Sequence, residues 1–219
     1  IVRRLDAAGF QLHLHAMGDG AVRAGLDALA RAARVNGPRD RRHQIAHLGL
    51  VDASDLGRFK TLGVAANVQP QWAQADDPAL AGITRALGAR RSARLYPIGS
   101  LGAAGARIVI GSDWPSTALN PLQSIQVALT RQPLAGSKPA FGARQRIGLA
   151  AALAAITRDA AWAAGEESIS GSIEVGKAAD LVVLERNLFE VEVARLHQVR
   201  VLLTLLDGEA VWRDPDLAW

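Results

Sequence analysis

The sequence predicts an α/β fold in which parallel strands alternate with helices as part of a (β/α) barrel, followed by a small β-rich segment. Three β-type runs each end on a side chain that can bind a metal, namely His15, His47 and Asp113. Helix-like segments separate these runs, and after Ser168 the pattern changes to short β runs divided by glycine turns. Because barrel enzymes place their reactive groups at the carboxyl ends of strands, we expect the three side chains to meet at the mouth of the barrel.

The first half of the chain reads as repeats of strand and helix. Gly9 and Gly63 end two of the helices. Amino-terminal caps are expected from Asp19 and from either Asp52 or Ser54. In chain order the expected elements are a helix over residues 1–9, a strand over 10–15, a helix over 19–34, a strand over 43–48, a helix ending at 62 and a strand over 64–68.

The second half begins with a long segment, residues 69–94, that we expect to be a loop; loops of this length in compact domains are typically functional lids. The later expected elements are a helix over 96–104, a strand over 107–110, helices over 120–130 and 144–164, the latter broken near 157–159, and strands over 172–175, 180–184, 199–206 and 209–212. Asp207-Gly208 fits a tight turn in an antiparallel sheet. We therefore divide the chain into a partial barrel, residues 1–165, and a β-rich subdomain, residues 166–219.

Composition restricts the classes of function. The chain has 219 residues, 49% of them apolar, a formal net charge of +4 and no cysteine. Its scattered cations lack the interleaved aromatics of nucleic-acid-binding proteins, and no apolar run approaches the roughly 20 residues that cross a bilayer. We expect a cytoplasmic protein that binds a small-molecule substrate, and neither nucleic acid nor membrane. Without cysteine, a metal site must use His, Asp and Glu, which suits zinc, iron, manganese or nickel.

Two pairs of histidines lie in the first two β runs, and strand geometry separates their roles. His13 and His15 share one strand face because side-chain direction repeats every two residues. His15 is last in its run and is the expected metal ligand, whereas His13 lies one layer deeper and is expected to be a core histidine. By the same argument His43 and His47 share a face. His47 is the expected ligand, and His43 is expected to cap backbone carbonyls where the strand begins.

Asp113 comes three residues after the apolar strand expected over 107–110. A buried carboxylate without a partner costs several kcal/mol, so we expect a cation nearby, and a metal ion with its bound water would supply one. The alternative is that Asp113 caps the turn at Trp114-Pro115.

Three further residues, Gln69, Trp72 and Trp114, lie on segments beyond strand ends. They are expected either to line a substrate pocket or to pack the loops on the barrel.

Two other sequence motifs do not match their consensus. Gly18-Asp19-Gly20 lacks the third glycine of a dinucleotide-binding loop, and the chain has no G-x-S-x-G elbow, which argues against a serine α/β-hydrolase.

These residues occur in sequence motifs that resemble those of a known family. The match is to the C-terminal part of metal-dependent amidohydrolases, in the branch (amidohydrolase family 3) that includes N-substituted formamide deformylases, and it runs over nearly the whole chain. The similar phrases are HLHAMGDGAV at 13–22, HQIAHLGLVD at 43–52, GVAANVQPQWAQAD at 63–76, GSDWP at 111–115 and GSIEVGKAADLVVL at 171–184.

The resemblance implies the C-terminal half of a TIM-like (β/α)8 barrel, with His15 on strand five, His47 on strand six and Asp113 on strand eight. Part of a β-sandwich, shared with the extreme N-terminus of the full protein, would follow. It also implies that the two histidines bind one or two divalent ions, with zinc favoured, and that Asp113 both ligates and handles the proton of the attacking water. Two departures, Ala46 in place of a frequent glutamate and Trp72 in place of a frequent histidine, bear on the metal count and the substrate.

We therefore predict a metal-dependent hydrolase that acts on a C–N bond of a small molecule, such as an amide or an N-substituted formamide. The first-strand His-x-His pair and the fourth-strand lysine of the family lie upstream of Ile1. We accordingly expect a fragment that is inactive alone and is completed by the remaining barrel half or by a homo-oligomer partner. The alternatives are a non-catalytic half-barrel remnant, and a deaminase or cyclic-amide hydrolase on the same barrel.

Overall fold

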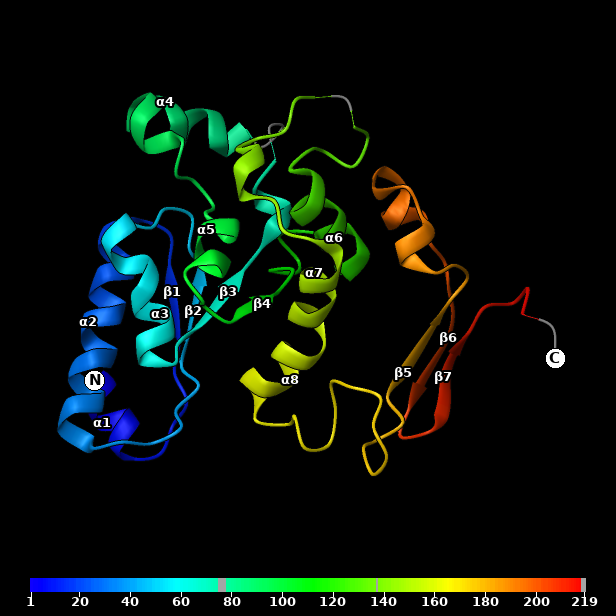
Figure 1. Ribbon diagram of the computed structural model, residues 1–219, viewed down its shortest axis with the longest axis horizontal. Helices are drawn as coiled ribbons and strands as arrows, with labels where there is room; N and C mark the ends of the chain where they lie inside the picture. Colours follow the sequence, from blue (N-terminus) through cyan, green and yellow to red (C-terminus); the bar gives the residue numbers. More distant parts are fainter. Residues whose placement is uncertain (75–77, 137, 218–219) are drawn as a thin grey trace.

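The computed structural model describes residues 1–74, 78–136 and 138–217. It is a mixed α/β structure with two separate sheets (Figure 1). The helices and strands, in chain order, are α1 (Val2–Ala7), β1 (His13–Ala16), α2 (Asp19–Asn36), β2 (Gln44–His47), α3 (Leu56–Leu62), β3 (Ala65–Val68), α4 (Pro78–Ser92), α5 (Ile98–Ala103), β4 (Ile108–Ile110), α6 (Pro121–Thr130), α7 (Leu149–Ile156), α8 (Arg158–Ala164), β5 (Leu181–Leu184), β6 (Val201–Leu206) and β7 (Glu209–Arg213). Short 3-10 turns follow several of them: η1 (Ala53–Asp55), η2 (Pro70–Trp72), η3 (Ala143–Gln145), η4 (Leu188–Glu190) and η5 (Val193–Gln198).

The first sheet is parallel, with the strand order β1-β2-β3-β4. Parallel neighbours need a crossover connection, and helices supply it here. All four strands therefore point their carboxyl ends in one direction, as the alternating sequence pattern predicts.

One face of this sheet packs on helices α2 and α3 (Figure 1). Leu26 of α2, Ile45 of β2 and Phe59 of α3 are fully buried together in the main core. Gly25 permits this contact, because a Cβ there would lie 3.3 Å from the Cδ1 atom of Ile45. Helix α8 lies on the other side, where Ala163 packs against Ala65 and Val109.

Several predicted helix ends are confirmed. Gly63 ends α3 in the left-handed conformation, with φ 62°. Asp52 caps η1, because its side chain accepts a hydrogen bond from the backbone N–H of Ser54. One cap was predicted wrongly. Gly18 is the N-cap of α2, and Asp19 lies in the first turn, where its charge still complements the helix dipole.

The segment expected to be one long loop contains helix α4, so that prediction is wrong over residues 78–92. The segment is rich in good helix formers, but it has no strong apolar stripe, and the periodicity of its apolar residues therefore did not indicate a helix.

The expected strand over 172–175 is absent. Ile173 and Val175 are almost fully exposed, and a strand without a neighbouring strand has no ladder to join.

The second sheet is antiparallel, in the order β5-β6-β7. The predicted turn between β6 and β7 has positive φ at Asp207 and Gly208. The preceding 3-10 turns connect this sheet to the first core, since Leu188 and Leu196 belong to the same buried cluster as the first sheet. A boundary after residue 165 thus separates the two sheets, whereas one buried cluster spans it. The division of the chain into two domains at this point stays a prediction. No helix in the described part of the chain is long and apolar enough to cross a membrane.

Candidate functional site

The two expected histidine ligands meet at the carboxyl ends of β1 and β2. The ring centroids of His15 and His47 are 4.3 Å apart, with the ring planes at 60°. His15 is exposed and His47 is half-buried. Among the described residues, neither ring has a hydrogen bond or an ion pair. The nitrogen lone pairs of both rings are therefore available to a ligand.

Strand alternation alone does not explain this contact. In the register of the sheet His15 pairs with Ala46, and His47 pairs with Ala16. An extended His47 would thus point to the opposite face, together with the buried Ile45. Its φ is instead +71°, which turns the ring toward His15. The prediction that His43 and His47 share a face is wrong for this reason.

The electrostatic surroundings favour the neutral form of His47. Burial lowers its pKa, and the neighbouring His15 lowers it further, while the carboxylate of Asp113 acts in the opposite direction. A neutral imidazole is the form that binds a metal ion.

Asp113 follows β4 with φ 62° and is half-buried. Its carboxylate has no hydrogen-bond or salt-bridge partner among the described residues. Even so, in residues 1–74, 78–136 and 138–217 no three His, Asp or Glu side chains converge closely enough to hold a metal ion. Strand β3 separates β2 from β4, a spacing of roughly 10 Å at about 4.8 Å per strand. The structure thus brings His15 and His47 together and leaves Asp113 outside a three-ligand cluster.

His13 and His43, the other histidines of the first two β runs, are not part of this pair. His13 lies exposed on β1. His43 is buried, with 2% exposure, and its Nδ1 accepts a hydrogen bond from the backbone N–H of Leu12 at 3.0 Å. Its Nε2 must therefore carry the proton and donate it to Oδ1 of Asp6, and these two atoms are 3.1 Å apart. His43 is structural as expected, but it accepts a backbone N–H where the sequence predicted contact with carbonyls.

The three expected substrate-binding residues lie in different environments. Trp114 is 65% exposed beside Asp113. Trp72 is half-buried against a small apolar cluster that includes Tyr96, and its Nε1 is buried without a hydrogen-bond partner in the described chain. Gln69 is buried, and both ends of its amide bond to protein atoms. Their assignment to substrate stays a prediction.

Sequence reasoning missed two amides, Gln44 and Asn67, that lie on the sheet face that carries His13 and His15. Asn67 Nδ2 donates to Gln44 Oε1 at 2.9 Å, and Gln69 Nε2 donates to Asn67 Oδ1 at 2.7 Å. The available signal was the presence of two polar amides inside short, otherwise apolar strands.

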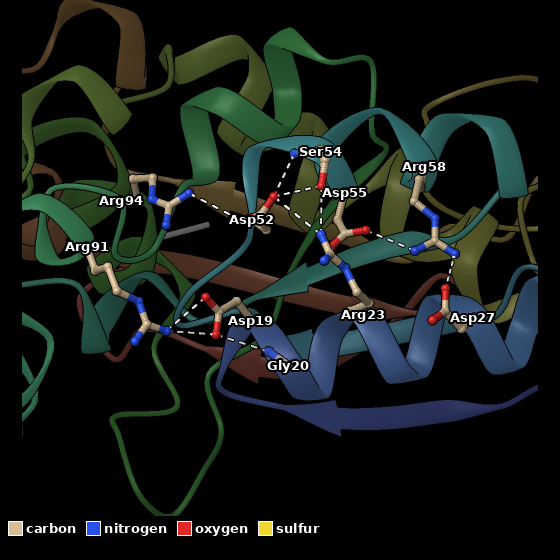
Figure 2. A network of polar contacts seen from close by, with 10 residues as sticks. All are labelled: Asp19, Gly20, Arg23, Asp27, Asp52, Ser54, Asp55, Arg58, Arg91 and Arg94. Carbon is tan, nitrogen blue, oxygen red and sulfur yellow. Dashed lines mark hydrogen bonds and ion pairs between the residues drawn. The ribbon is translucent and has the colours of Figure 1, made fainter.

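Sequence reasoning also missed a network of ion pairs that crosses the loops after β1 and β2 (Figure 2). Arg91, at the end of α4, contacts both carboxylate oxygens of Asp19 at 2.9 Å. Arg94 lies 3.6 Å from Asp52. Asp19 follows His15 by four positions and Asp52 follows His47 by five. The network therefore joins the end of α4 to the segments that follow the two strands carrying the histidine pair.

The network continues along the outer helices. Arg23 pairs with Asp52 and with Asp55, and Arg58 pairs with Asp55 and Asp27 (Figure 2). These arginines thus neutralise local acids and do not form a free basic patch.

Comparison with known proteins identifies the class. The model of the amidohydrolase family matches residues 1–212, and the chain belongs to this family. It is 35% identical over 208 residues to the protein LONG AFTER FAR-RED 3 of Arabidopsis thaliana, covering 94% of this chain and 35% of that protein. It is 28% identical over 209 residues to an N-substituted formamide deformylase of Arthrobacter pascens, covering 94% and 37% respectively. The chain spans little more than a third of the length of these relatives.

Solved structures agree with the class at the level of fold. An uncharacterized metal-dependent hydrolase from Pyrococcus horikoshii OT3 aligns with a TM-score of 0.72 and 24% identity, covering 86% of this chain and 36% of that one. An adenosine deaminase from Xanthomonas campestris with bound zinc aligns with a TM-score of 0.66 and 21% identity, covering 99% and 49%. The mixed α/β fold of this chain is thus similar to part of each of these structures, and the family itself rests on the sequence match over residues 1–212.

Proposed function

We propose that this chain carries the histidine part of the active site of a metal-dependent amidohydrolase that cleaves a C–N bond in a small molecule. The observation that carries the proposal is the pair His15 and His47, with rings 4.3 Å apart at the carboxyl ends of adjacent parallel strands. The similarity to a protein named N-substituted formamide deformylase supports an amide or a formamide as the substrate class.

The donor chemistry of the pair fits a divalent metal. Two imidazoles without other partners, one of them with a lowered pKa, suit zinc, which takes His and carboxylate ligands in catalytic sites. Asp113 is the proposed third ligand, and it would have to approach the pair. The remaining ligands would come from protein outside these residues, because the described residues contain no group of three.

In this proposal the metal, when bound, polarises the scissile carbonyl and makes water acidic enough to attack at neutral pH. Asp113 accepts the proton from the attacking water and passes it to the leaving nitrogen, as a general base and then a general acid. Its half-buried carboxylate has no competing donor in the described chain. His15 and His47 act as neutral ligands, and Trp114 lies beside Asp113 where a substrate would enter.

The architecture that we propose for the whole protein is a closed (β/α)8 barrel of which β1 to β4 are strands five to eight. Among the described residues β1 pairs only with β2, and β4 only with β3. Both outer edges therefore present unpaired backbone groups, which require a partner strand or cover. The rest of a longer polypeptide, or a second copy of this chain, would supply it, and the three-stranded sheet would join a β-sandwich.

Two alternatives keep specific support. The absence of a three-ligand group among the described residues favours a non-catalytic remnant. The structural similarity to an adenosine deaminase favours deamination. Product analysis separates the enzymes, because hydrolysis of an N-substituted formamide releases formate and an amine, whereas a deaminase releases ammonia.

The experiment that tests the proposal measures zinc binding to the 219-residue chain by calorimetry. We expect binding that is lost in His15→Ala and in His47→Ala, whereas His13→Ala, the matched control on the same strand, retains it. If the chain does not bind zinc, or if all three variants weaken binding equally, the proposed site is wrong. Asp113→Asn should keep the fold and abolish turnover by the full-length enzyme, so an active variant would contradict the role of Asp113.

A further inference from the structure

Three side-chain amides form a continuous chain of hydrogen bonds on the sheet face that carries His13 and His15. Gln44 Nε2 donates to the carbonyl of Ala163 at 3.4 Å, and Gln44 Oε1 accepts from Asn67 at 2.9 Å. Asn67 Oδ1 in turn accepts from Gln69 at 2.7 Å. Gln69 Oε1 accepts the backbone N–H of His47 at 2.9 Å. We call Gln44, Asn67 and Gln69 the amide relay.

The two ends of the amide relay fix the orientation of every amide in it. A backbone N–H can only donate, so the oxygen of Gln69 must face His47. A backbone carbonyl can only accept, so the nitrogen of Gln44 must face Ala163. Each intervening amide then has one possible orientation. The relay is therefore a directed chain of four bonds, and the usual ambiguity between amide oxygen and nitrogen does not apply.

The relay ends at the residue whose backbone departs from the strand. His47 has φ +71° and the next residue, Leu48, has φ 53°. A non-glycine residue with positive φ is unfavourable and needs support from its surroundings. The bond from the N–H of His47 to the buried Gln69 gives that support, because it fixes the peptide unit before His47 just beyond Ala46, where the pairing of β2 with β3 ends.

The relay also contacts the strand that leads to Asp113. A Cβ on Gly111 would lie 3.3 Å from both Asn67 Oδ1 and Gln69 Nε2. The bond between these two amides thus lies over the backbone at the end of β4, two residues before Asp113. Strand β3 carries no candidate ligand. However, Asn67 on this strand and Gln69 just after it contact the ends of β2 and β4, the neighbouring strands that lead to His47 and Asp113.

We propose that Gln69, whose amide is bonded to Asn67, is a positioning residue that keeps His47 in the left-handed conformation and so turns its ring toward His15. This deepens the proposed function, on which it rests for the use of His47 as a ligand. The geometric part does not depend on catalysis. Gln69 is therefore assigned to the backbone of a ligand, and its amide oxygen and its amide nitrogen each bond to a protein atom.

The test replaces Gln69 and reads the geometry of His47 directly, in the 219-residue chain. NMR would follow hydrogen exchange of the His47 N–H and the cross-peak between the His15 and His47 rings, and a Co²⁺ titration would follow metal affinity. In Gln69→Leu we expect loss of the protected N–H, loss of the cross-peak and Co²⁺ binding weaker by about tenfold or more, as for other supports of metal ligands. Gln69→Glu keeps an acceptor for the His47 N–H and should retain both NMR signals.

The matched control is Gln44→Leu, which breaks the relay at its far end and leaves the bond to His47. It should keep the cross-peak and bind Co²⁺ within about twofold of the original chain. If Gln69→Leu also keeps both signals, or if Gln44→Leu and Gln69→Glu lose them equally with it, the proposal is overturned.

Two further outcomes distinguish failure of the proposed function from failure of the positioning role of Gln69. If the original chain shows the NMR signals and their loss in Gln69→Leu but binds no Co²⁺, the proposed function fails while the positioning role stands. If Gln69→Leu does not fold, Gln69→Asn replaces it, because the shorter side chain cannot reach both partners. Retention of the protected N–H in Gln69→Asn would overturn the proposal.

Discussion

Two histidines at opposite ends of β2, His43 directly before the strand and His47 as its last residue, show how the two ends of the parallel sheet differ. His43 lies at the amino end, is buried and uses both ring nitrogens. His47 lies at the carboxyl end, is half-buried, and its ring has no hydrogen-bond partner among the described residues. The amino end is therefore a satisfied structural core, whereas the carboxyl end keeps polar groups available. That division is the one expected of barrel enzymes, which separate stability from chemistry along their strands.

The carboxylate of Asp6 organises the amino end. It accepts hydrogen bonds from Arg39, Arg41 and Asn36 and lies against His43. Burial by itself would raise the pKa of Asp6, but the hydrogen bonds from these neighbours outweigh it and hold the pKa well below its usual value. The cluster joins α1 to the segment before β2.

The largest effect is expected from removing the centre of that cluster. Asp6→Ala leaves a buried guanidinium and a buried imidazole without their acceptor, which should lower the free energy of unfolding by about 3–5 kcal/mol. Urea denaturation measures this. Asp27→Ala, which removes an exposed partner of Arg58, is the control and should cost less than about 1 kcal/mol. Equal effects of the two substitutions would contradict the buried role of Asp6.

The same substitution at His43 and at His47, at the two ends of β2, tests the comparison directly. His43→Ala should destabilise by about 2–4 kcal/mol, because Asp6 and the N–H of Leu12 lose a buried partner. His47→Ala should change stability by less than about 1 kcal/mol, since its ring bonds to nothing in the described chain. Thermal and urea unfolding would report both values, and a reversed order would break the proposed division of the sheet.

Acid should destabilise the protein through the amino end first. Burial lowers the pKa of His43 from 6.5 despite the nearby Asp6, so the unfolded chain binds more protons than the folded one below about pH 6.5. Stability should therefore fall as the pH drops below that value. It should fall again below about pH 4, as the unfolded form of Asp6 takes up its proton.

His43→Gln keeps a donor and an acceptor at the same place but cannot titrate. Unfolding measured from pH 7 to pH 5 should depend less on pH in this variant than in the original chain, with a remaining dependence from His47, whose pKa is also lowered. An unchanged slope would show that His43 titrates normally.

The smallest effect is expected from the exposed ion pairs at the carboxyl end. Arg91→Met removes the contact between α4 and Asp19 (Figure 2), and exposed pairs contribute at most about 1 kcal/mol. Global stability should hardly change, whereas proteolysis within α4 should become faster. Raising the salt concentration should have the same effect on the original chain, because salt screens exposed charges. If neither Arg91→Met nor added salt changes the rate of proteolysis within α4, the apolar contacts of this helix alone keep it in place.

Local features of the fold were predictable because each rests on residues close in sequence. Gly63 ended its helix, Asp52 capped its turn, and the helix predicted over 144–164 broke at Thr157 as expected. Helix α4 was missed because its sequence lacks an apolar stripe. The strand predicted over residues 172–175 is absent because alternating apolar and polar residues do not form a strand without a neighbouring strand to pair with.

The sequence by itself determined the parallel α/β pattern, the family, and the positions of His15 and His47 at the ends of strands. Those properties follow from local periodicity and from recognisable phrases. Only the tertiary structure decided that His47 turns out of its strand, that Gln69 accepts its N–H, and that His43 is buried between Asp6 and the backbone as a structural residue. These depend on contacts between residues 22 to 37 positions apart, and strand alternation, which assumes an extended backbone at every residue, cannot reveal them.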